Sequence, residues 1–177
     1  MKLNLASGTD IRDGWVNLDA VAKWPLARRG CDILWDARKD KIPFLDGVVQ
    51  EVYAGYLLLH LAPRFHGLVL DDIRRVLMDG GTLTVGEVDM GIVMERWIAN
   101  PNDSRLSELI WGEQGVVENV EVSGDQLELE AYDKHCHGFT EEALCALLSS
   151  HGFGDFKRIQ IHSPDVFYEL TITCRKV

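Results

Sequence analysis

Alternating polar and apolar positions predict that the first half of the chain is built largely from short β-strands. Residues 2–6 alternate and run into the turn Ser7-Gly8-Thr9, and two further short apolar stretches each end at a carboxylate, Asp19 or Asp36. Two longer stretches carry Val, Thr and Tyr with few charges, which is typical of strands inside a sheet. The predicted strands are residues 2–6, 15–18, 31–34, 48–56 and 82–88.

Apolar residues recur at helical spacing between the last two of these strands. Six of them, from Phe65 to Leu77, fall on one face of a helix that we expect to end before Gly80-Gly81. A second helix is expected from the N-cap Thr140 to about Gly152, because two glutamates occupy its first turn and three leucines share one face. Shorter helices are expected near 92–98 and 104–111, and closing strands at 156–162 and 167–174, which could form a hairpin around residues 163–165.

Strands that alternate with helices and end in a paired set predict an α/β fold with a doubly wound, Rossmann-like sheet. We expect residues 1–177 to form a single domain with a lid or insert at about 91–135. Ligands of such sheets bind at the carboxyl ends of the strands. Ala6-Ser7-Gly8, Asp19, Asp36 and Ala54-Gly55-Tyr56 should therefore lie along one edge of the sheet.

Composition and charge narrow the range of partners. The chain has 177 residues, a formal net charge of −10 and a sequence pI near 5.0, which argues against DNA or RNA as the main partner. No apolar run is long enough to cross a membrane, and four scattered cysteines without a signal peptide favour a reduced, cytoplasmic setting. Between Arg105 and Lys134 every charged residue is acidic, as in a solvated surface or in a lid that attracts a cation.

The predicted edge has the features of a nucleoside site. A glycine-containing turn allows backbone N–H groups to approach a ligand, and an acidic residue such as Asp19 can accept hydrogen bonds from two ribose hydroxyls. The G-x-G-x-x-G, P-loop and G-x-S-x-G motifs are all absent from the sequence. Their absence disfavours NAD and FAD and leaves no signature of phosphoryl transfer or of a serine hydrolase. A nucleoside without phosphate therefore fits better.

Several stretches resemble the class I S-adenosylmethionine-dependent methyltransferases, especially small bacterial methyltransferase-like proteins. The resemblance is strongest over residues 2–89, and His137-Gly138-Phe139-Thr140 and residues 148–153 extend it. It implies a mostly parallel sheet with an antiparallel C-terminal strand, S-adenosylmethionine as cofactor and methyl transfer to a small-molecule acceptor, with no metal. The stretches concerned in residues 2–89 are Lys2–Gly8 (KLNLASG), Gly14–Asp19 (GWVNLD), Ile42-Pro43-Phe44, Val52–Tyr56 (VYAGY) and Arg75–Leu83 (RVLMDGGTL).

The same resemblance assigns roles to residues along the edge of the sheet. Asp19 would bind the ribose, and Ala6, Ser7 and Gly8 would surround the methionine and ribose parts of the cofactor. The remaining assignments are Asp36 and Ala37 at the adenine, Ala54, Gly55 and Tyr56 at the transfer site, and Tyr56 and His60 as candidate catalytic residues. Self-association into a homo-oligomer is compatible with this interpretation.

Three positions depart from the family pattern. Ala6 stands at the usual first glycine of the loop, Leu59 at the usual glutamate before His60, and Asp79 at the usual proline before Gly80-Gly81. The alternative function is therefore a catalytically degenerate binding or interaction module that keeps the methyltransferase fold.

Other residues also have two interpretations. His60 could be a base or a structural histidine beside an apolar turn, and Tyr56 could orient the acceptor or simply end its strand. His135 and His137 could serve a metal or an acceptor, or lie on the surface, and no third ligand stands at motif spacing. Trp97 and Trp111 could line a pocket or docking face, or pack within a helical insert.

Overall fold

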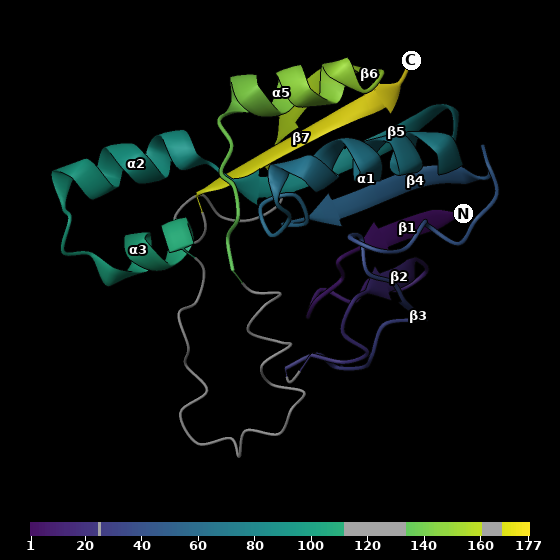
Figure 1. The fold of residues 1–177 in the computed structure, drawn as a ribbon, viewed down its shortest axis with the longest axis horizontal. Coiled ribbons are helices and arrows are strands. Elements are labelled where there is room, and N and C mark those ends of the chain that lie inside the picture. Colours follow the sequence, from purple (N-terminus) through teal and green to yellow (C-terminus); the bar gives the residue numbers. More distant parts are fainter. Residues whose placement is uncertain (25, 112–133, 161–167) are drawn as a thin grey trace.

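The protein contains a seven-stranded sheet with the strand order β3-β2-β1-β4-β5-β7-β6 (Figure 1). The computed structural model describes residues 1–24, 26–111, 134–160 and 168–177. Its strands are β1 (Lys2–Leu5), β2 (Val16–Asp19), β3 (Ile33–Leu34), β4 (Val49–Gly55), β5 (Leu77–Val88), β6 (Phe153–Ile159) and β7 (Glu169–Lys176).

The first five strands run parallel, and β7 pairs antiparallel with both β5 and β6. The chain leaves β1 in one direction to build β2 and β3, and then returns to the other side of β1 to build β4 and β5. The mostly parallel, Rossmann-like sheet with antiparallel C-terminal strands is therefore confirmed, and its strand order reverses at β1 as in a doubly wound sheet. The carboxyl ends of β1 and β4, where this reversal occurs, are the expected ligand position of such a sheet.

The helices are α1 (Pro63–Val76), α2 (Met90–Ala99), α3 (Ser104–Trp111) and α5 (Glu141–Ser150). Each corresponds to a helix expected from the sequence. Pro63 starts α1, where its missing N–H costs nothing, and Thr140 caps α5 by accepting a hydrogen bond from the Ala143 N–H. The predicted N-cap at Thr140 is thus confirmed.

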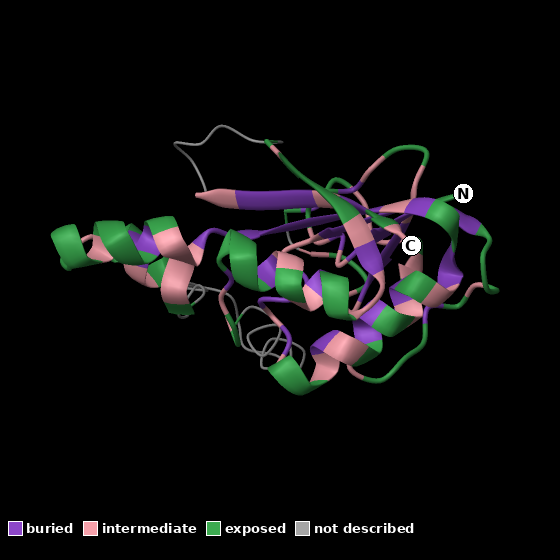
Figure 2. Cartoon of the chain, turned by 90° about the horizontal axis from the view of Figure 1, so that it is seen from above, coloured by how far each residue is buried: buried purple, intermediate pink, exposed green. Residues whose placement is uncertain are grey.

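The two faces of the sheet differ in chemistry. Leucine, valine and isoleucine side chains cover one face and pack against α1 and α5, which lie on the same side of the sheet (Figures 1 and 2). The opposite face carries polar side chains such as Asn4, Asn17, Tyr53 and Thr84, which alternate with the apolar ones along each strand. No helix of the described residues covers this polar face.

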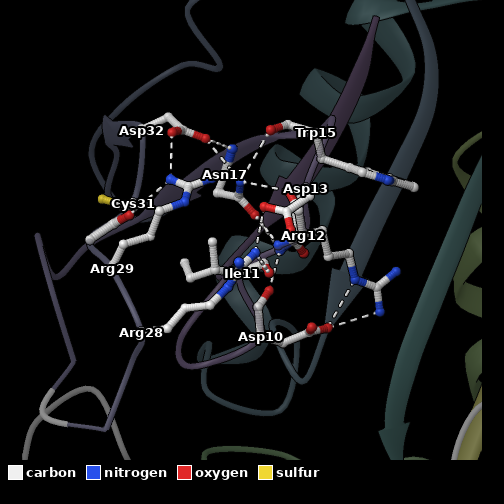
Figure 3. A network of polar contacts seen from close by, with 12 residues as sticks. Asp10, Ile11, Arg12, Asp13, Trp15, Asn17, Arg28, Arg29, Cys31 and Asp32 are labelled. Atoms are coloured by element: carbon white, nitrogen blue, oxygen red, sulfur yellow. Dashed lines mark hydrogen bonds and ion pairs between the residues drawn. The ribbon is translucent and has the colours of Figure 1, made fainter.

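The connection between β1 and β2 forms no helix in the structure. Instead, the buried Asn17 side chain binds the loop: its Oδ1 accepts from the Arg12 N–H at 2.8 Å and from Asn4 Nδ2 at 2.9 Å (Figure 3). Its Nδ2 donates to the carbonyl oxygens of Arg12 and Trp15, both at 3.1 Å. A single amide side chain thereby satisfies backbone groups that a crossover helix would satisfy internally.

Some boundaries differ from the sequence predictions. β5 starts at Leu77, directly after α1, and a register shift opposite residues 49–51 places the Gly80-Gly81 turn within this strand. β6 starts three residues before the predicted strand, and β7 starts and ends two residues later than predicted. The antiparallel pairing of β6 and β7 is confirmed, whereas the predicted turn at 163–165 and residues 112–133 of the predicted lid lie outside the described residues.

Helices α2 and α3 pack together beyond the carboxyl ends of β4 and β5 (Figure 1). Their contact contains Val93 and Leu106, together with Leu59 and Val88 from the body of the protein. Trp97 packs against this small cluster, whereas Trp111 is 62% exposed. Within the described part of the chain, no helix has the length and apolar character needed to cross a membrane.

Candidate functional site

A cavity of about 560 Å³ opens at the carboxyl ends of β1, β2 and β4. Its walls come from four connections: the turn after β1, the loops that follow β2 and β3, and the turn between β4 and α1. Cavities of roughly 300–1,000 Å³ are typical of small-molecule and cofactor sites. The predicted site residues that line it are Ala6, Ser7, Gly8, Asp19, Asp36, Ala37, Gly55, Tyr56 and His60.

The turn after β1 is built from two residues in the left-handed region, Ala6 with φ 50° and Gly8 with φ 50°. The N–H of Ser7 donates to the Leu18 carbonyl at 3.0 Å, which ties this turn to β2. The Ser7 hydroxyl is buried and has no hydrogen-bond partner among the described residues. Buried hydroxyls are normally hydrogen-bonded, so an unbonded one in a residue that lines the cavity is an unusual feature of this turn.

Asp19 occupies the position of the expected ribose acceptor and is 5% exposed. Its Oδ2 accepts from the Gly8 N–H at 2.8 Å, and its Oδ1 accepts from the Val21 N–H at 2.8 Å and from Trp24 Nε1 at 3.0 Å. A carboxylate offers about four lone-pair positions, two on each oxygen. These three bonds fix the orientation of the Asp19 carboxylate, and they leave one lone-pair position on Oδ2 for a further donor.

Asp36 lies at the cavity beside two cations. Arg38 donates Nε to Oδ1 and Nη2 to Oδ2, each at 3.0 Å, and Lys39 Nζ lies 3.0 Å from Oδ2. Partial burial acts to raise the pKa of Asp36, but the hydrogen bonds from Arg38 and Lys39 outweigh it and hold the pKa well below its usual range. This carboxylate is therefore ionised at neutral pH and already bound by cations.

The end of β4 contributes two tyrosines. Tyr53 lies across Gly55, so closely that a Cβ on Gly55 would stand 2.7 Å from Tyr53 Cε1, and the Arg12 guanidinium lies 3.4 Å from the centre of the Tyr53 ring. Tyr56 adopts φ 55°, and its buried hydroxyl has no hydrogen-bond partner in the described part of the chain. Burial is the main cause that raises the pKa of Tyr56, so its phenol keeps its proton at neutral pH.

Ala54 does not take the position that the resemblance implies. Its side chain is 1% exposed and packs in the apolar core, on the face of the sheet that α1 and α5 cover. It is not among the described residues that line the cavity. Side chains alternate along a strand, so Ala54 points to the opposite face from its neighbours Tyr53 and Gly55.

His60 lies in the turn between β4 and α1 and faces the segment 134–137. Its Nδ1 is 3.3 Å from the Lys134 carbonyl oxygen. A carbonyl oxygen only accepts, so Nδ1 is the donor in this contact. The same segment is attached to the turn by the N–H groups of Cys136 and His137, which donate to the Leu59 carbonyl at 2.6 and 3.2 Å.

Several known structures have this architecture. A SAM-dependent methyltransferase from Thermotoga maritima, described as a possible histamine N-methyltransferase, aligns with 99% of this chain and 82% of its own, at a TM-score of 0.63 and 18% identity. A SAM-dependent methyltransferase from Methanosarcina mazei aligns with 99% of this chain and 92% of its own, at a TM-score of 0.59 and 16% identity. The 1,6-didemethyltoxoflavin-N1-methyltransferase of Burkholderia thailandensis, solved with S-adenosylhomocysteine, aligns with 99% of this chain and 70% of its own, at a TM-score of 0.57 and 16% identity. The chain has the class I methyltransferase fold. No family model and no curated protein matches its sequence.

Within this methyltransferase fold, His135 and His137 point to different partners. The His135 ring contacts His60 with ring centres 5.1 Å apart, whereas the His137 ring contacts His66 at 5.3 Å and Phe139 at 4.6 Å. Among the described residues, no three side chains of His, Cys, Asp or Glu converge on a point where a metal could bind. The His135 ring thus packs against His60 of the turn between β4 and α1, and the His137 ring against His66 of α1 and Phe139.

Sequence reasoning missed several residues that line the cavity of this methyltransferase fold. Trp35 and Arg38 flank the predicted Asp36, and their closeness in sequence is a signal that could have indicated them. Tyr53 belongs to a strand that was predicted correctly, but the sequence did not show which face of that strand would line the cavity. Trp24 comes from an irregular loop, where no periodicity indicates direction.

Proposed function

We propose that this protein transfers a methyl group from S-adenosylmethionine to a small-molecule acceptor. The observation that carries the proposal is the cavity at the carboxyl ends of β1, β2 and β4, with the Asp19 carboxylate in its wall. Two buried hydroxyls without partners, on Ser7 and Tyr56, belong to residues that line the same cavity. This set of groups suits a polar ligand that carries no phosphate.

The residues present fit the nucleoside part of the cofactor. Asp19 Oδ2 would accept a ribose hydroxyl at its remaining lone-pair position. For the second hydroxyl to reach Oδ1, the Trp24 indole would have to give up its bond to that oxygen. Ala37 would face the adenine, while Asp36 keeps its pair with Arg38 at the edge of this subsite.

When bound, S-adenosylmethionine supplies an electrophilic methyl group carried on a sulfonium. The acceptor would give up a proton as its nucleophilic atom gains the methyl group, so a base is needed when this atom belongs to a hydroxyl or an ammonium. His60, which lines the cavity, would be the candidate base that takes this proton. The Tyr56 phenol would act as a hydrogen-bond donor that orients the acceptor.

Two departures from the family pattern do not remove the cavity. Ala6 adopts the left-handed conformation that the turn requires, and the cavity forms around it. Leu59 is 2% exposed and packs against Val88, Val93 and Leu106, so its side chain serves the contact with α2 and α3. These observations favour the enzyme over the degenerate module.

Calorimetric titration with S-adenosylmethionine, and separately with S-adenosylhomocysteine, tests the proposal. We expect micromolar binding of both by the unaltered protein. Asp19→Asn keeps the shape of the side chain but removes its charge and one acceptor oxygen, so binding should weaken by about 3 kcal/mol, roughly 100-fold. Thermal unfolding of both proteins would show that the variant remains folded.

Asp79→Asn is the matched control. Asp79 is fully exposed near the amino end of β5, whereas the cavity lies at the carboxyl ends of the parallel strands. This variant should bind both ligands as the unaltered protein does. Binding that is lost in the first variant only would justify a screen of small-molecule acceptors. No binding by the unaltered protein would contradict the proposal and favour the non-catalytic binding or interaction module.

A further inference from the structure

Glu87 is an acid on the apolar face of the sheet. Residues 83, 85 and 87 of β5 point to the same side, where Leu83 and Val85 pack in the core, and the Glu87 side chain is 0% exposed. A carboxyl group in such a place is costly unless its oxygens are hydrogen-bonded. Its position therefore calls for a specific role.

Both oxygens of Glu87 bind the turn between β4 and α1, residues 56–61. Oε1 accepts from the Leu58 N–H at 3.0 Å and Oε2 from the Leu59 N–H at 3.2 Å, and both contacts are buried. The preceding residue of β5, Gly86, accepts from the Tyr56 N–H at 2.6 Å. Two consecutive residues of β5 thus hold the first half of this turn.

The opposite side of the turn is held by another buried titratable side chain. His66 of α1, 3% exposed, places Nε2 2.9 Å from the Leu58 carbonyl oxygen and 3.0 Å from that of Leu61. Carbonyl oxygens only accept, so Nε2 carries the proton and donates to both. The turn's backbone is therefore fixed by an acid that receives its N–H groups and by an imidazole that donates to its carbonyls.

This turn is a wall of the cavity. Tyr56, Leu57, His60 and Leu61 all belong to it and line the cavity, whereas Glu87 and His66 are not among the described residues that line it. We infer that Glu87 is a positioning residue, which holds the turn that carries Tyr56 and His60 in the geometry the ligand requires. The inference rests on the proposed function for its ligand, and on the two buried hydrogen bonds for its geometry.

The test compares Glu87→Gln and Glu87→Met with the unaltered protein. Glutamine keeps the shape and one acceptor oxygen but presents an NH₂ group to one of the two N–H donors, and methionine removes both acceptors at similar volume. Glu51→Gln is the matched control, because Glu51 of β4 is partly exposed and pairs with Lys2. Circular dichroism and urea unfolding would confirm that each variant is folded.

Amide hydrogen exchange gives a readout that needs no cofactor. In Glu87→Met the amides of Leu58 and Leu59 should exchange about tenfold faster or more, because each loses its acceptor, while those of Ala54 and Val85 keep their protection. In the unaltered protein the proton shifts of the same two amides should titrate together as Glu87 ionises, and they should stay flat in Glu87→Gln. Unchanged exchange in the methionine variant would overturn the inference.

Binding of S-adenosylhomocysteine connects the turn to the cavity. Its dissociation constant should rise about tenfold in Glu87→Met and stay unchanged in Glu51→Gln. Faster exchange with unchanged binding would show that Glu87 shapes the turn without positioning the ligand site, and would also overturn the inference. If the unaltered protein bound no cofactor, the proposed function would fail, while the exchange data would still decide whether Glu87 holds the turn.

Discussion

At the scale of single residues, two positions in the cavity wall have unusual backbone conformations. Ala6 and Tyr56 have φ values of 50° and 55°, in a region that residues with a Cβ rarely occupy, and both line the cavity. Such conformations are unfavourable by roughly 1–3 kcal/mol and tend to occur at functional sites. The sequence indicated the first of them, because Ala6 stands where the resembling family has glycine, but nothing in the sequence indicated the second.

Ala6→Gly should stabilise the protein. Removing the Cβ relieves a left-handed conformation that is unfavourable by about 1 kcal/mol or more, although glycine gives back part of this gain through its freedom in the unfolded chain. We expect a net increase in the free energy of unfolding of somewhat under 1 kcal/mol, measured by urea denaturation. Ala37→Gly, at a position outside the left-handed region, should instead lower it by about 0.5–1 kcal/mol. A loss of stability in both variants would show that the Ala6 conformation is unstrained.

At the scale of elements, periodic patterns were predicted well and irregular connections were not. Apolar spacing indicated α1 and α5 to within a few residues, because both bury a stripe against the same sheet face. The connection after β1 depends instead on the buried Asn17 side chain, whose bonds to Arg12 and Trp15 form only once the loop has folded. No spacing rule contains that information, so the position of this part of the cavity wall could not be predicted.

Gly55→Ala tests how tightly β4 and the cavity wall fit. The new Cβ would stand 2.7 Å from Tyr53 Cε1 and 2.8 Å from Tyr53 Oη, a separation that real Cβ atoms do not adopt. The Tyr53 ring is also confined by the Arg12 guanidinium at 3.4 Å. We therefore expect a loss of about 1–3 kcal/mol in the free energy of unfolding, together with weaker binding of S-adenosylhomocysteine.

A double-mutant cycle separates this contact from a general effect on the strand. Because Tyr53→Ala removes the atoms that the new Cβ would meet, Gly55→Ala should cost much less stability in that background. The coupling free energy, obtained from urea unfolding of the four proteins, should be on the order of 1 kcal/mol or more. Additive effects would show that the backbone conformation of Gly55, not the Tyr53 ring, limits this position.

At the scale of the whole molecule, the sheet separates packing from chemistry. Its apolar face is covered by α1 and α5. The opposite face carries polar side chains, and two of them, Asn4 and Tyr53, line the cavity. Glu87 is the exception, since it is a carboxyl group buried on the packing face. Sequence reasoning predicted the sheet and the edge at which the cavity lies, but it placed Glu87 simply within a strand, because its two backbone partners become neighbours only in the folded protein.

This buried carboxyl group should make the stability of the whole protein depend on pH. Burial raises the pKa of Glu87 to about 8, against the partial opposition of the Leu58 and Leu59 N–H groups. The folded state therefore holds a proton that the unfolded state releases near pH 4.5. The resulting contribution is fully present below the unfolded pKa, declines as pH rises, and is lost as pH passes the folded pKa near 8.

Urea unfolding of the unaltered protein and of Glu87→Gln at pH 6, 7, 8 and 9 measures this contribution. The difference between the two proteins cancels groups that titrate alike in both. The free energy of unfolding of the unaltered protein should fall relative to that of the variant by at most about 1.4 kcal/mol per pH unit up to pH 8, and level off above it. The carboxylate of Asp36 does not disturb this window, because its pKa is lowered and it stays ionised throughout. A difference that is constant from pH 6 to 9 would mean that Glu87 is already ionised in the folded protein, and that the two N–H donors suffice to hold its charge within the core.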